Sequence, residues 1–222
     1  EIVGNTNVSG LVGISNSEYT ECIIQNSYNS GHINGNLNVG GIVGYSSNNT
    51  DIKQCYNIGE ITGKSQTGGI SGYITRETEI SRCYNKGNIE ATGQNTSGGN
   101  SNVGGIVGIN NSTVIDCYNT GIVNGIYNNI GGIIGLNRGK LENSYNVGNT
   151  NGFIDKKGGI TGNNDIYYYE EEDSTFTGKI YNSYSLEGSS SKLYGTNNSI
   201  IGDECSFKTS LELQNLYTTL GD

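Results

Sequence analysis

The feature that most constrains the fold is a short phrase, two glycines enclosing two mostly aliphatic residues, that occurs six times. The six blocks are Gly10-Leu11-Val12-Gly13, Gly41-Ile42-Val43-Gly44, Gly69-Ile70-Ser71-Gly72, Gly105-Ile106-Val107-Gly108, Gly132-Ile133-Ile134-Gly135 and Gly159-Ile160-Thr161-Gly162. Successive blocks start 31, 28, 36, 27 and 27 residues apart, so the basic unit has about 27 residues and some units carry insertions. Self-similarity at such a period is typical of a stacked repeat protein.

A second phrase, centred on a Tyr-Asn pair, lies between the blocks. It reads Ser27-Tyr28-Asn29, Cys55-Tyr56-Asn57, Cys83-Tyr84-Asn85, Cys117-Tyr118-Asn119 and Ser144-Tyr145-Asn146, and it weakens to Ser183-Tyr184-Ser185. An aliphatic residue precedes each Cys or Ser by three positions, and a Gly follows each of the first five Asn by two. A third short apolar block follows in several coils, as in Glu60-Ile61-Thr62-Gly63. Each unit therefore holds three short apolar segments separated by Gly and Asn.

These apolar segments are too short for helices, and β-branched runs between turn residues favour strands. Gly and Asn tolerate positive φ, so they are expected at the corners. Three strands and three turns make one coil of a solenoid, and stacking at about 4.8 Å buries the aliphatic side chains of each coil. The sequence therefore predicts an all-β, right-handed parallel β-helix of about six coils over residues 1–205.

Both ends of the chain fit this interpretation. The segment Glu1-Ile2-Val3-Gly4 resembles the third arm of a preceding coil, so we expect the chain to be part of a longer protein. Near the other end, Thr209-Ser210-Leu211-Glu212 fits a capping box, three leucines follow at helical spacing, and Gly221 suits a C-cap. We predict a short helix over Thr209–Leu220, within a C-terminal cap of residues 206–222 that covers the last coil.

The composition excludes two classes of partner. The net charge is -9 with 12 Lys+Arg, whereas nucleic-acid binding needs clustered basic residues. No apolar run approaches the roughly 20 residues that a membrane-spanning helix needs. We therefore expect no nucleic-acid partner and no membrane insertion of this segment. The low hydrophobic fraction of 32% suits a solenoid, because each coil needs only a thin apolar column.

Together, the phrases Gly-Gly-Ile-Val-Gly and Cys/Ser-Tyr-Asn-x-Gly-x-Ile-x-Gly resemble the GLUG repeat, closely over about residues 1–165 and weakly over 166–205. GLUG repeats occur in bacterial cell-surface and secreted proteins, including some IgA1-specific zinc metallopeptidases, where they lie outside the catalytic part. The resemblance implies an extracellular or cell-surface location and a role in structural display or adhesion. A host glycan or host protein is then the expected partner, besides the rest of a larger surface protein. The His-Glu-x-x-His zinc motif of those peptidases is absent from this sequence.

No residue pattern predicts catalysis, a cofactor or a metal site. The single histidine, His32, occupies a repeat position that varies between coils, which is typical of a solvent-facing residue. Cys55, Cys83 and Cys117 share a position that Ser fills in other coils, and this interchange predicts a small, buried slot holding reduced thiols. We therefore expect a protein that is not an enzyme. A polysaccharide-active β-helix enzyme and a dedicated carbohydrate-binding module are the alternatives.

Two further columns follow from the repeat. Asn29 and its equivalents to Asn146 are predicted to fill turns, with side chains stacked between coils. The tyrosines of the second phrase form a column with two open interpretations. They pack on one another as a structural ladder, or they present an exposed platform on which sugar rings stack.

An insertion supplies the predicted contact site for a partner. Ser183 lies 24 positions after Gly159, whereas the same step is 12 positions in the two preceding coils. Strand-like stretches at Ile166–Tyr169 and Thr175–Thr177 predict a hairpin that protrudes from a corner, where function tends to lie. Its contact residues are expected to be Tyr167, Tyr168, Tyr169, Glu170, Glu171, Glu172, Asp173 and Phe176. The acidic run is alternatively a Ca²⁺ site or a solvated loop. A second insertion, Thr92–Asn102, has the composition of a flexible loop.

Overall fold

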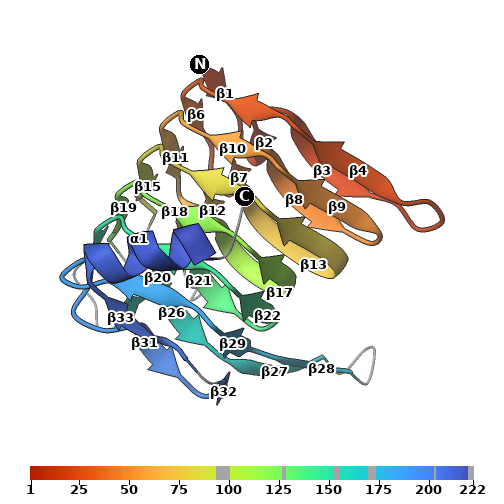
Figure 1. Ribbon diagram of the computed structural model, residues 1–222. Helices are drawn as coiled ribbons and strands as arrows, with labels where there is room; N and C mark the ends of the chain where they lie inside the picture. Colours follow the sequence, from red (N-terminus) through yellow and green to blue (C-terminus); the bar gives the residue numbers. More distant parts are fainter. Residues whose placement is uncertain (94–100, 127–128, 153–155, 170–173, 203, 220–222) are drawn as a thin grey trace.

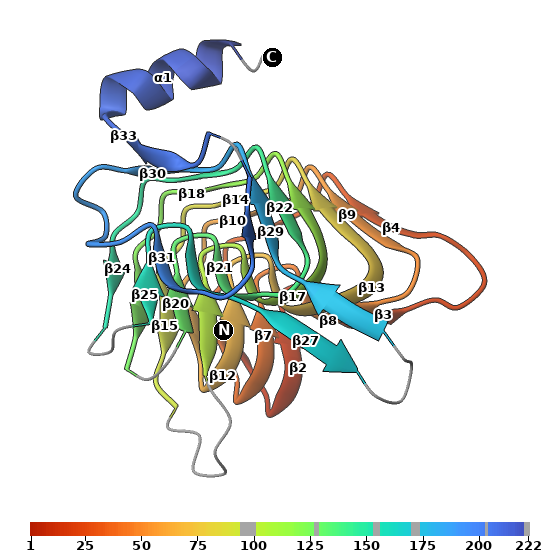
Figure 2. The same cartoon turned by 90° about the horizontal axis from the view of Figure 1, so that it is seen from below.

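The computed structural model describes residues 1–93, 101–126, 129–152, 156–169, 174–202 and 204–219. Its strands stack coil upon coil into a rod whose walls are four parallel sheets, here called sheets A to D (Figures 1 and 2). The described part of the chain is thus a parallel β-helix, as the repeat predicts.

Sheets A and B each contain six strands. Sheet A consists of β1 (Ile2–Val3), β6 (Ile33–Asn34), β11 (Ile61–Gly63), β15 (Ile89–Ala91), β19 (Val123–Gly125) and β24 (Thr150–Asn151). Sheet B consists of β2 (Thr6–Ser9), β7 (Leu37–Gly40), β12 (Ser65–Gly68), β16 (Asn102–Gly104), β20 (Asn129–Gly131) and β25 (Lys157–Gly158).

Sheets C and D form the other walls. The main path of sheet C is β3 (Val12–Asn16), β8 (Val43–Ser47), β13 (Ser71–Ser81), β17 (Val107–Ile115), β21 (Ile134–Asn137), β26 (Thr161–Asn164) and β31 (Tyr194–Asn197). Past a corner, sheet C continues in β4 (Cys22–Gln25), β9 (Thr50–Lys53), β22 (Lys140–Glu142), β29 (Lys179–Tyr181) and β32 (Ile200–Ile201). Sheet D is β5 (Tyr28–Asn29), β10 (Tyr56–Asn57), β14 (Tyr84–Asn85), β18 (Tyr118–Asn119), β23 (Tyr145–Asn146), β30 (Tyr184–Leu186) and β33 (Ser206–Lys208).

A coil therefore contains more strands than the three expected. The second coil passes through β7, β8, β9, β10 and β11, five strands in four sheets. The glycine block is itself a corner, because Gly41 and Ile42 lie between β7 and β8. Counting apolar runs in the sequence gives too few strands, because some strands also bury polar side chains. Ser46 in β8 and Thr67 in β12 are examples, and both are fully buried.

The interior holds two apolar clusters. The larger one contains Ile42, Ile70, Ile106, Ile133 and Ile160, all fully buried, so stacking buries the aliphatic side chains of the glycine blocks as expected. Backbone hydrogen bonds join these residues coil to coil, for example from Ile70 N to Ile106 O at 2.9 Å. The smaller cluster lies between sheets A and B and includes Ile33, Ile61 and Ile89. Both clusters draw buried residues from successive coils, so the core is continuous along the rod.

Glycine does lie at corners, but the expected reason, a positive φ, is wrong: among the described glycines only Gly188 (φ 85) has one. Among described non-glycine residues, positive φ occurs mainly at Asn, as at Asn48 (φ 53), and at Gln54 (φ 55), just before Cys55. The block glycines are needed because of close approach between coils instead. A Cβ on Gly41 would lie 2.2 Å from the carbonyl oxygen of Gly69, and one on Gly69 would lie 2.2 Å from that of Gly105. Side chains here would push the coils apart.

Buried asparagines form two hydrogen-bonded ladders along the rod. The predicted one is confirmed: Asn29, Asn57, Asn85, Asn119 and Asn146 are joined through their side-chain amides at 2.7–2.9 Å. A second ladder, which the repeat analysis did not identify, joins the buried Asn110, Asn137 and Asn164 to the exposed Asn197 at 2.7–2.8 Å. Each inner amide both donates and accepts along the stack, so these buried polar side chains are satisfied between coils.

The C-terminal end extends further than the phrases indicate. Sheets C and D each have a seventh described layer, β31 and β33, so an incomplete turn follows the six expected coils, and solenoid pairing runs through Lys208. The predicted helix is present as α1 (Ser210–Thr219), with the capping box formed by Thr209 and Glu212. Over its described residues, α1 lies beside the rod next to β33 rather than across the end of the last coil (Figure 2). None of the described helices is long and apolar enough to cross a membrane.

Candidate binding groove

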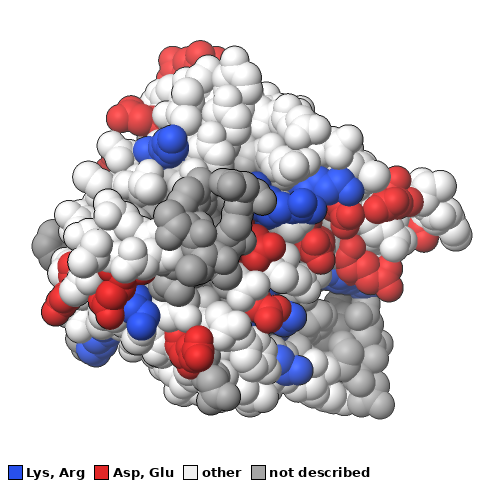
Figure 3. Space-filling model, viewed as in Figure 1, with Lys and Arg blue, Asp and Glu red and all other residues white. Residues whose placement is uncertain are grey.

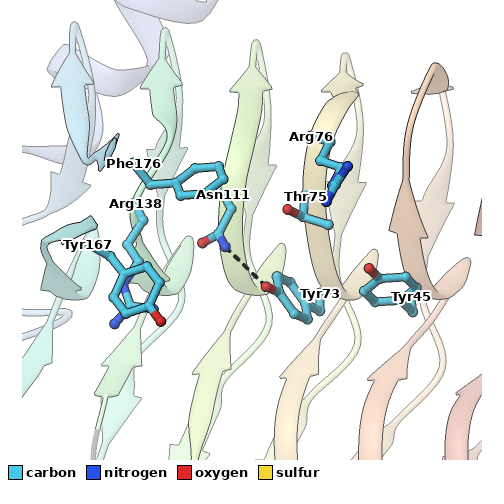
Figure 4. A pocket seen from close by; sticks show the side chains of 8 residues that line it. All are labelled: Tyr45, Tyr73, Thr75, Arg76, Asn111, Arg138, Tyr167 and Phe176. Carbon is cyan, nitrogen blue, oxygen red and sulfur yellow. Dashed lines mark hydrogen bonds between the residues drawn. The ribbon is translucent and has the colours of Figure 1, made fainter. Parts of the chain in front are cut away.

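A groove of about 270 Å³ lies on the outer side of sheet C, against the inserted hairpin. Eight side chains line it (Figure 4): Tyr45, Tyr73, Thr75, Arg76, Asn111, Arg138, Tyr167 and Phe176. They come from the second to the fifth coil and from the hairpin. Four of the eight are aromatic, and the others carry amide, hydroxyl or guanidinium groups.

The alternation of a β-strand explains why these side chains face outward together. Tyr45 and Tyr73 directly follow the second glycine of their blocks, and they are paired in register on β8 and β13. The next residue along each strand points inward, as Ile74 does. The residue after that points outward again, which places Thr75 and Asn111 next to the tyrosines. The groove is thus made by two outward-facing repeat positions.

The hairpin that closes one end of the groove matches the prediction in position and topology. Strands β27 (Ile166–Tyr169) and β28 (Ser174–Thr177) are antiparallel and project sideways from the rod (Figures 1 and 2). Their base is closed by a hydrogen bond from Gly178 N to Asp165 O at 2.8 Å. The hairpin grows from the corner that Arg138 and Gly139 form in the coil before, because Asn164 pairs with Asn137 and Lys179 with Lys140.

Arg138 joins the hairpin to the solenoid. Its Nη2 lies 3.4 Å from Asp165 Oδ2, and its guanidinium carbon lies 4.3 Å from the centre of the Tyr167 ring. The ion pair and the cation–π contact both hold the hairpin base against the corner. The Nε atom of Arg138 is buried and has no hydrogen-bond partner, which leaves one donor at the groove unused.

Tyr73 and Asn111 form the polar centre of the groove. Asn111 Nδ2 donates to the Tyr73 hydroxyl at 3.1 Å, while Asn111 Oδ1 is buried without a partner. Tyr45 packs edge-on against Tyr73, with ring centres 5.4 Å apart. Burial, and next the neighbouring Tyr45, raise the pKa of Tyr73, so its hydroxyl is a neutral donor and acceptor. An unpaired buried carbonyl costs free energy until a donor reaches it.

The tyrosine column is a ladder. The rings of Tyr28, Tyr56, Tyr84, Tyr118 and Tyr145 stack face to face, 4.8–5.1 Å apart and within 7° of parallel. Between neighbours, both ring faces are therefore occupied, and only ring edges reach solvent. Sugar stacking needs a free face, so the interior of this column is not a platform. The structure thus favours the first of the two interpretations.

The repeat cysteines and His32 lie outside the groove, and none of them is part of a reactive or metal-binding site among the described residues. Cys55, Cys83 and Cys117 are free and buried in the larger cluster, as expected. Hydrogen bonding to Cys83 and burial raise the pKa of Cys55, and hydrogen bonding to Cys117 raises the pKa of Cys83, so both thiols are held protonated. His32 is partly exposed, with Nδ1 3.7 Å from a Glu1 carboxylate oxygen. Among the described residues, no group of three or more His, Cys, Asp or Glu is placed to hold a metal ion.

Part of the predicted contact site can be placed and part cannot. Tyr167 and Phe176 line the groove, whereas Tyr168 is exposed on β27 and is not part of the lining. The side chain of Tyr169 and the residues Glu170, Glu171, Glu172 and Asp173 lie outside the described residues, as does most of the Thr92–Asn102 insertion.

Sequence reasoning missed the sheet-side wall of the groove. Tyr45, Tyr73, Asn111 and Arg138 were not predicted, although a signal existed in the repeat. Tyr45 and Tyr73 stand one position after the second block glycine, and Asn111 and Arg138 stand three positions after it. Residue Asp165, where the insertion starts, has the same spacing from its glycine. Aligning the insertion with these columns would have indicated the shared corner.

The fold and this site define a parallel β-solenoid with one elaborated corner. Comparisons with known proteins give a family for its repeat: the GLUG motif matches residues 35–62, which span one coil from β7 into β11. The chain thus carries a GLUG repeat, and the resemblance drawn from its phrases is confirmed.

A solved structure shares the fold. It is the crystal structure of a "putative immunoglobulin A1 protease" from Bacteroides ovatus, with a TM-score of 0.55 and 21% sequence identity. The alignment covers 90% of this chain and 69% of that chain. At this identity the likeness shows the architecture alone. No curated protein matches the chain.

Proposed function

We propose that this chain is a non-catalytic display segment of a bacterial surface or secreted protein, whose sheet C corner binds a host ligand. The observation that carries the proposal is the groove: a regular rod repeats the same surface, whereas the insertion creates one site with convergent aromatic and polar groups. The GLUG repeat supports the cellular setting, because such repeats occur in surface and secreted proteins.

The chemistry of the groove supports binding over catalysis. None of its eight described lining residues is an aspartate or a glutamate. Glycosidases use a pair of carboxylates on either side of the scissile bond. The nearby Asp165 already pairs with Arg138. A polysaccharide-active enzyme is therefore the weaker candidate, and a carbohydrate-binding role is compatible with the same groove.

The test is adhesion of the labelled chain to host epithelial cells or mucosal glycoproteins, with and without the hairpin. Residues 166–177 should be removed so that Asp165 joins Gly178, because Asn164 belongs to a buried ladder and Asp165 pairs with Arg138. The resulting corner copies Asn137-Arg138-Gly139 of the preceding coil. The control lacks residues 94–100 of the other insertion.

We expect the hairpin deletion to abolish binding while the melting temperature changes little, and the control to bind normally. Binding that survives the deletion would place the ligand site on the coil faces. A deletion that unfolds the rod would show that the hairpin is part of the folded core instead of a display element.

A further inference from the structure

We propose that the groove holds one neutral sugar ring of an oligosaccharide, with Tyr45 and Tyr73 as its aromatic wall and Asn111 as its polar anchor. The inference rests on the proposed function, since it names the ligand class of the same corner. The size, the unpaired polar atoms and the charge of the groove support it.

The size and walls suit a ring that is apolar on its faces and polar at its rim. The volume of about 270 Å³ lies just below the range of roughly 300–1,000 Å³ for sites that enclose drug-sized ligands. Tyr45 and Tyr73 form one side, and Tyr167 and Phe176 stand at the hairpin end (Figure 4). The C–H groups of a pyranose carry partial positive charge, and they are attracted to the electron-rich faces of such rings.

The unused polar atoms call for a group that both donates and accepts hydrogen bonds. Asn111 is 91% buried, and its Oδ1 needs a donor. Arg138 Nε, also buried, needs an acceptor. A hydroxyl meets both needs, and neighbouring hydroxyls on a sugar ring can reach two such atoms at once. A ligand that leaves Asn111 Oδ1 unpaired gives up the free energy that a donor would recover.

The charge balance favours a neutral sugar over an acidic one. The guanidinium of Arg138 is already compensated by Asp165 at 3.4 Å. Arg76 lies at the exposed rim and is followed in sequence by the exposed Glu77. On the face shown in Figure 3, acidic and basic side chains are intermingled, and the chain as a whole carries a net charge of -9. A sialic or glucuronic acid would therefore meet net repulsion on approach.

The experiment titrates the intact chain by calorimetry and by amide NMR shifts. The probes are neutral galactose- and N-acetylglucosamine-terminated oligosaccharides, and the same compounds extended by sialic or glucuronic acid. The variants are Tyr45→Ala, Asn111→Leu and the control Tyr28→Ala. Tyr28 is the end ring of the tyrosine ladder and is 56% exposed, so the control also tests that ladder as a sugar platform.

We expect neutral compounds to bind and to shift amides around the groove. Tyr45→Ala and Asn111→Leu should each weaken binding about tenfold, which corresponds to about 1.4 kcal/mol, while Tyr28→Ala binds as the parent does. Thermal melting should show both groove variants folded, because neither side chain belongs to the apolar clusters.

Three results would overturn the inference. Tighter binding of the acidic compounds would refute the charge argument and leave the proposed function intact. Binding that is lost in Tyr28→Ala but kept in the groove variants would move the site to the ladder. Failure of all saccharides, combined with hairpin-dependent adhesion to cells, would identify a protein ligand. The proposed function itself fails only if adhesion does not depend on the hairpin.

Discussion

Changing one atom of the buried asparagine ladder should destabilise the whole rod. Asn85 is fully buried, accepts from Asn57 Nδ2 at 2.8 Å, and donates to Asn119 Oδ1 and to the Gly87 carbonyl at 2.8 Å each. In Asn85→Asp, the acceptor role survives and both donated bonds are lost. The new oxygen then faces two oxygens instead.

The magnitude follows from these contacts. Each lost hydrogen bond costs about 1 kcal/mol, and a buried charge without a partner costs roughly 3–5 kcal/mol. The sum, about 5–7 kcal/mol, is a large part of the 5–15 kcal/mol that stabilises a typical domain. Burial raises the pKa of the new carboxyl above its unfolded value, because it disfavours the charged form. The loss should therefore be largest at neutral pH and should shrink as the pH falls through the folded pKa.

The assay is urea unfolding followed by circular dichroism at pH 7 and pH 4. The matched control is Asn124→Asp, which also sits in an asparagine pair between coils. Asn124 only accepts there, from Asn151 Nδ2 at 3.0 Å, and the pair is exposed. We expect a large drop in the unfolding midpoint for Asn85→Asp at pH 7 and little change for the control. Equal midpoints for the two variants would refute the claim that the buried ladder stabilises the stack.

Further predictions concern the core and its thiols. Ile106→Asp should cost several kcal/mol in urea unfolding, because it places a charge in the fully buried column, whereas Ile106→Val should cost about 1 kcal/mol. Cys83→Ser should be tolerated at modest cost, since Ser144 fills the same position. The raised pKa values of Cys55 and Cys83 stabilise the fold fully below the unfolded thiol pKa of about 8.5. This contribution is lost as the pH rises beyond that, at about 1.4 kcal/mol per pH unit and thiol, so a Cys55→Ser/Cys83→Ser variant should show a flatter stability profile between pH 8 and pH 10.

The sequence repeat predicted the stacking of the coils well, because stacking depends on residues that recur at the same position in each coil. Ile106 and Asn85 each sit at a repeat position whose type is kept in neighbouring coils, and in-register pairing follows from that alone. The reason for the block glycines was not predictable in the same way. Close approach between backbones and positive φ both require glycine in a sequence, and only the three-dimensional structure distinguishes the two requirements at Gly41 and Gly69.

For a related reason, the hairpin side of the groove could be predicted from the sequence and the sheet side could not. Tyr167 and Phe176 were recognised because an insertion breaks the period, and its composition stands out against the coils. Tyr73 and Asn111 sit at positions that vary from coil to coil, and variation at a repeat position is what an ordinary exposed residue shows as well. They meet only because folding places residues that are 38 positions apart in the sequence on adjacent coils, where Asn111 donates a hydrogen bond to Tyr73.

The corner itself explains why the insertion and the groove coincide. A residue inserted into a wall strand would shift every later pairing out of register, and it would move buried side chains to the wrong face. The corner between Asn164 and Gly178 escapes this cost, because β29 regains its register at Lys179 and Ile180 whatever length precedes it. The outward positions next to that corner, such as Asn111 and Arg138, are equally free of the core. Changes that create a site can therefore accumulate at one corner while the stack stays intact, which is the property a display segment needs.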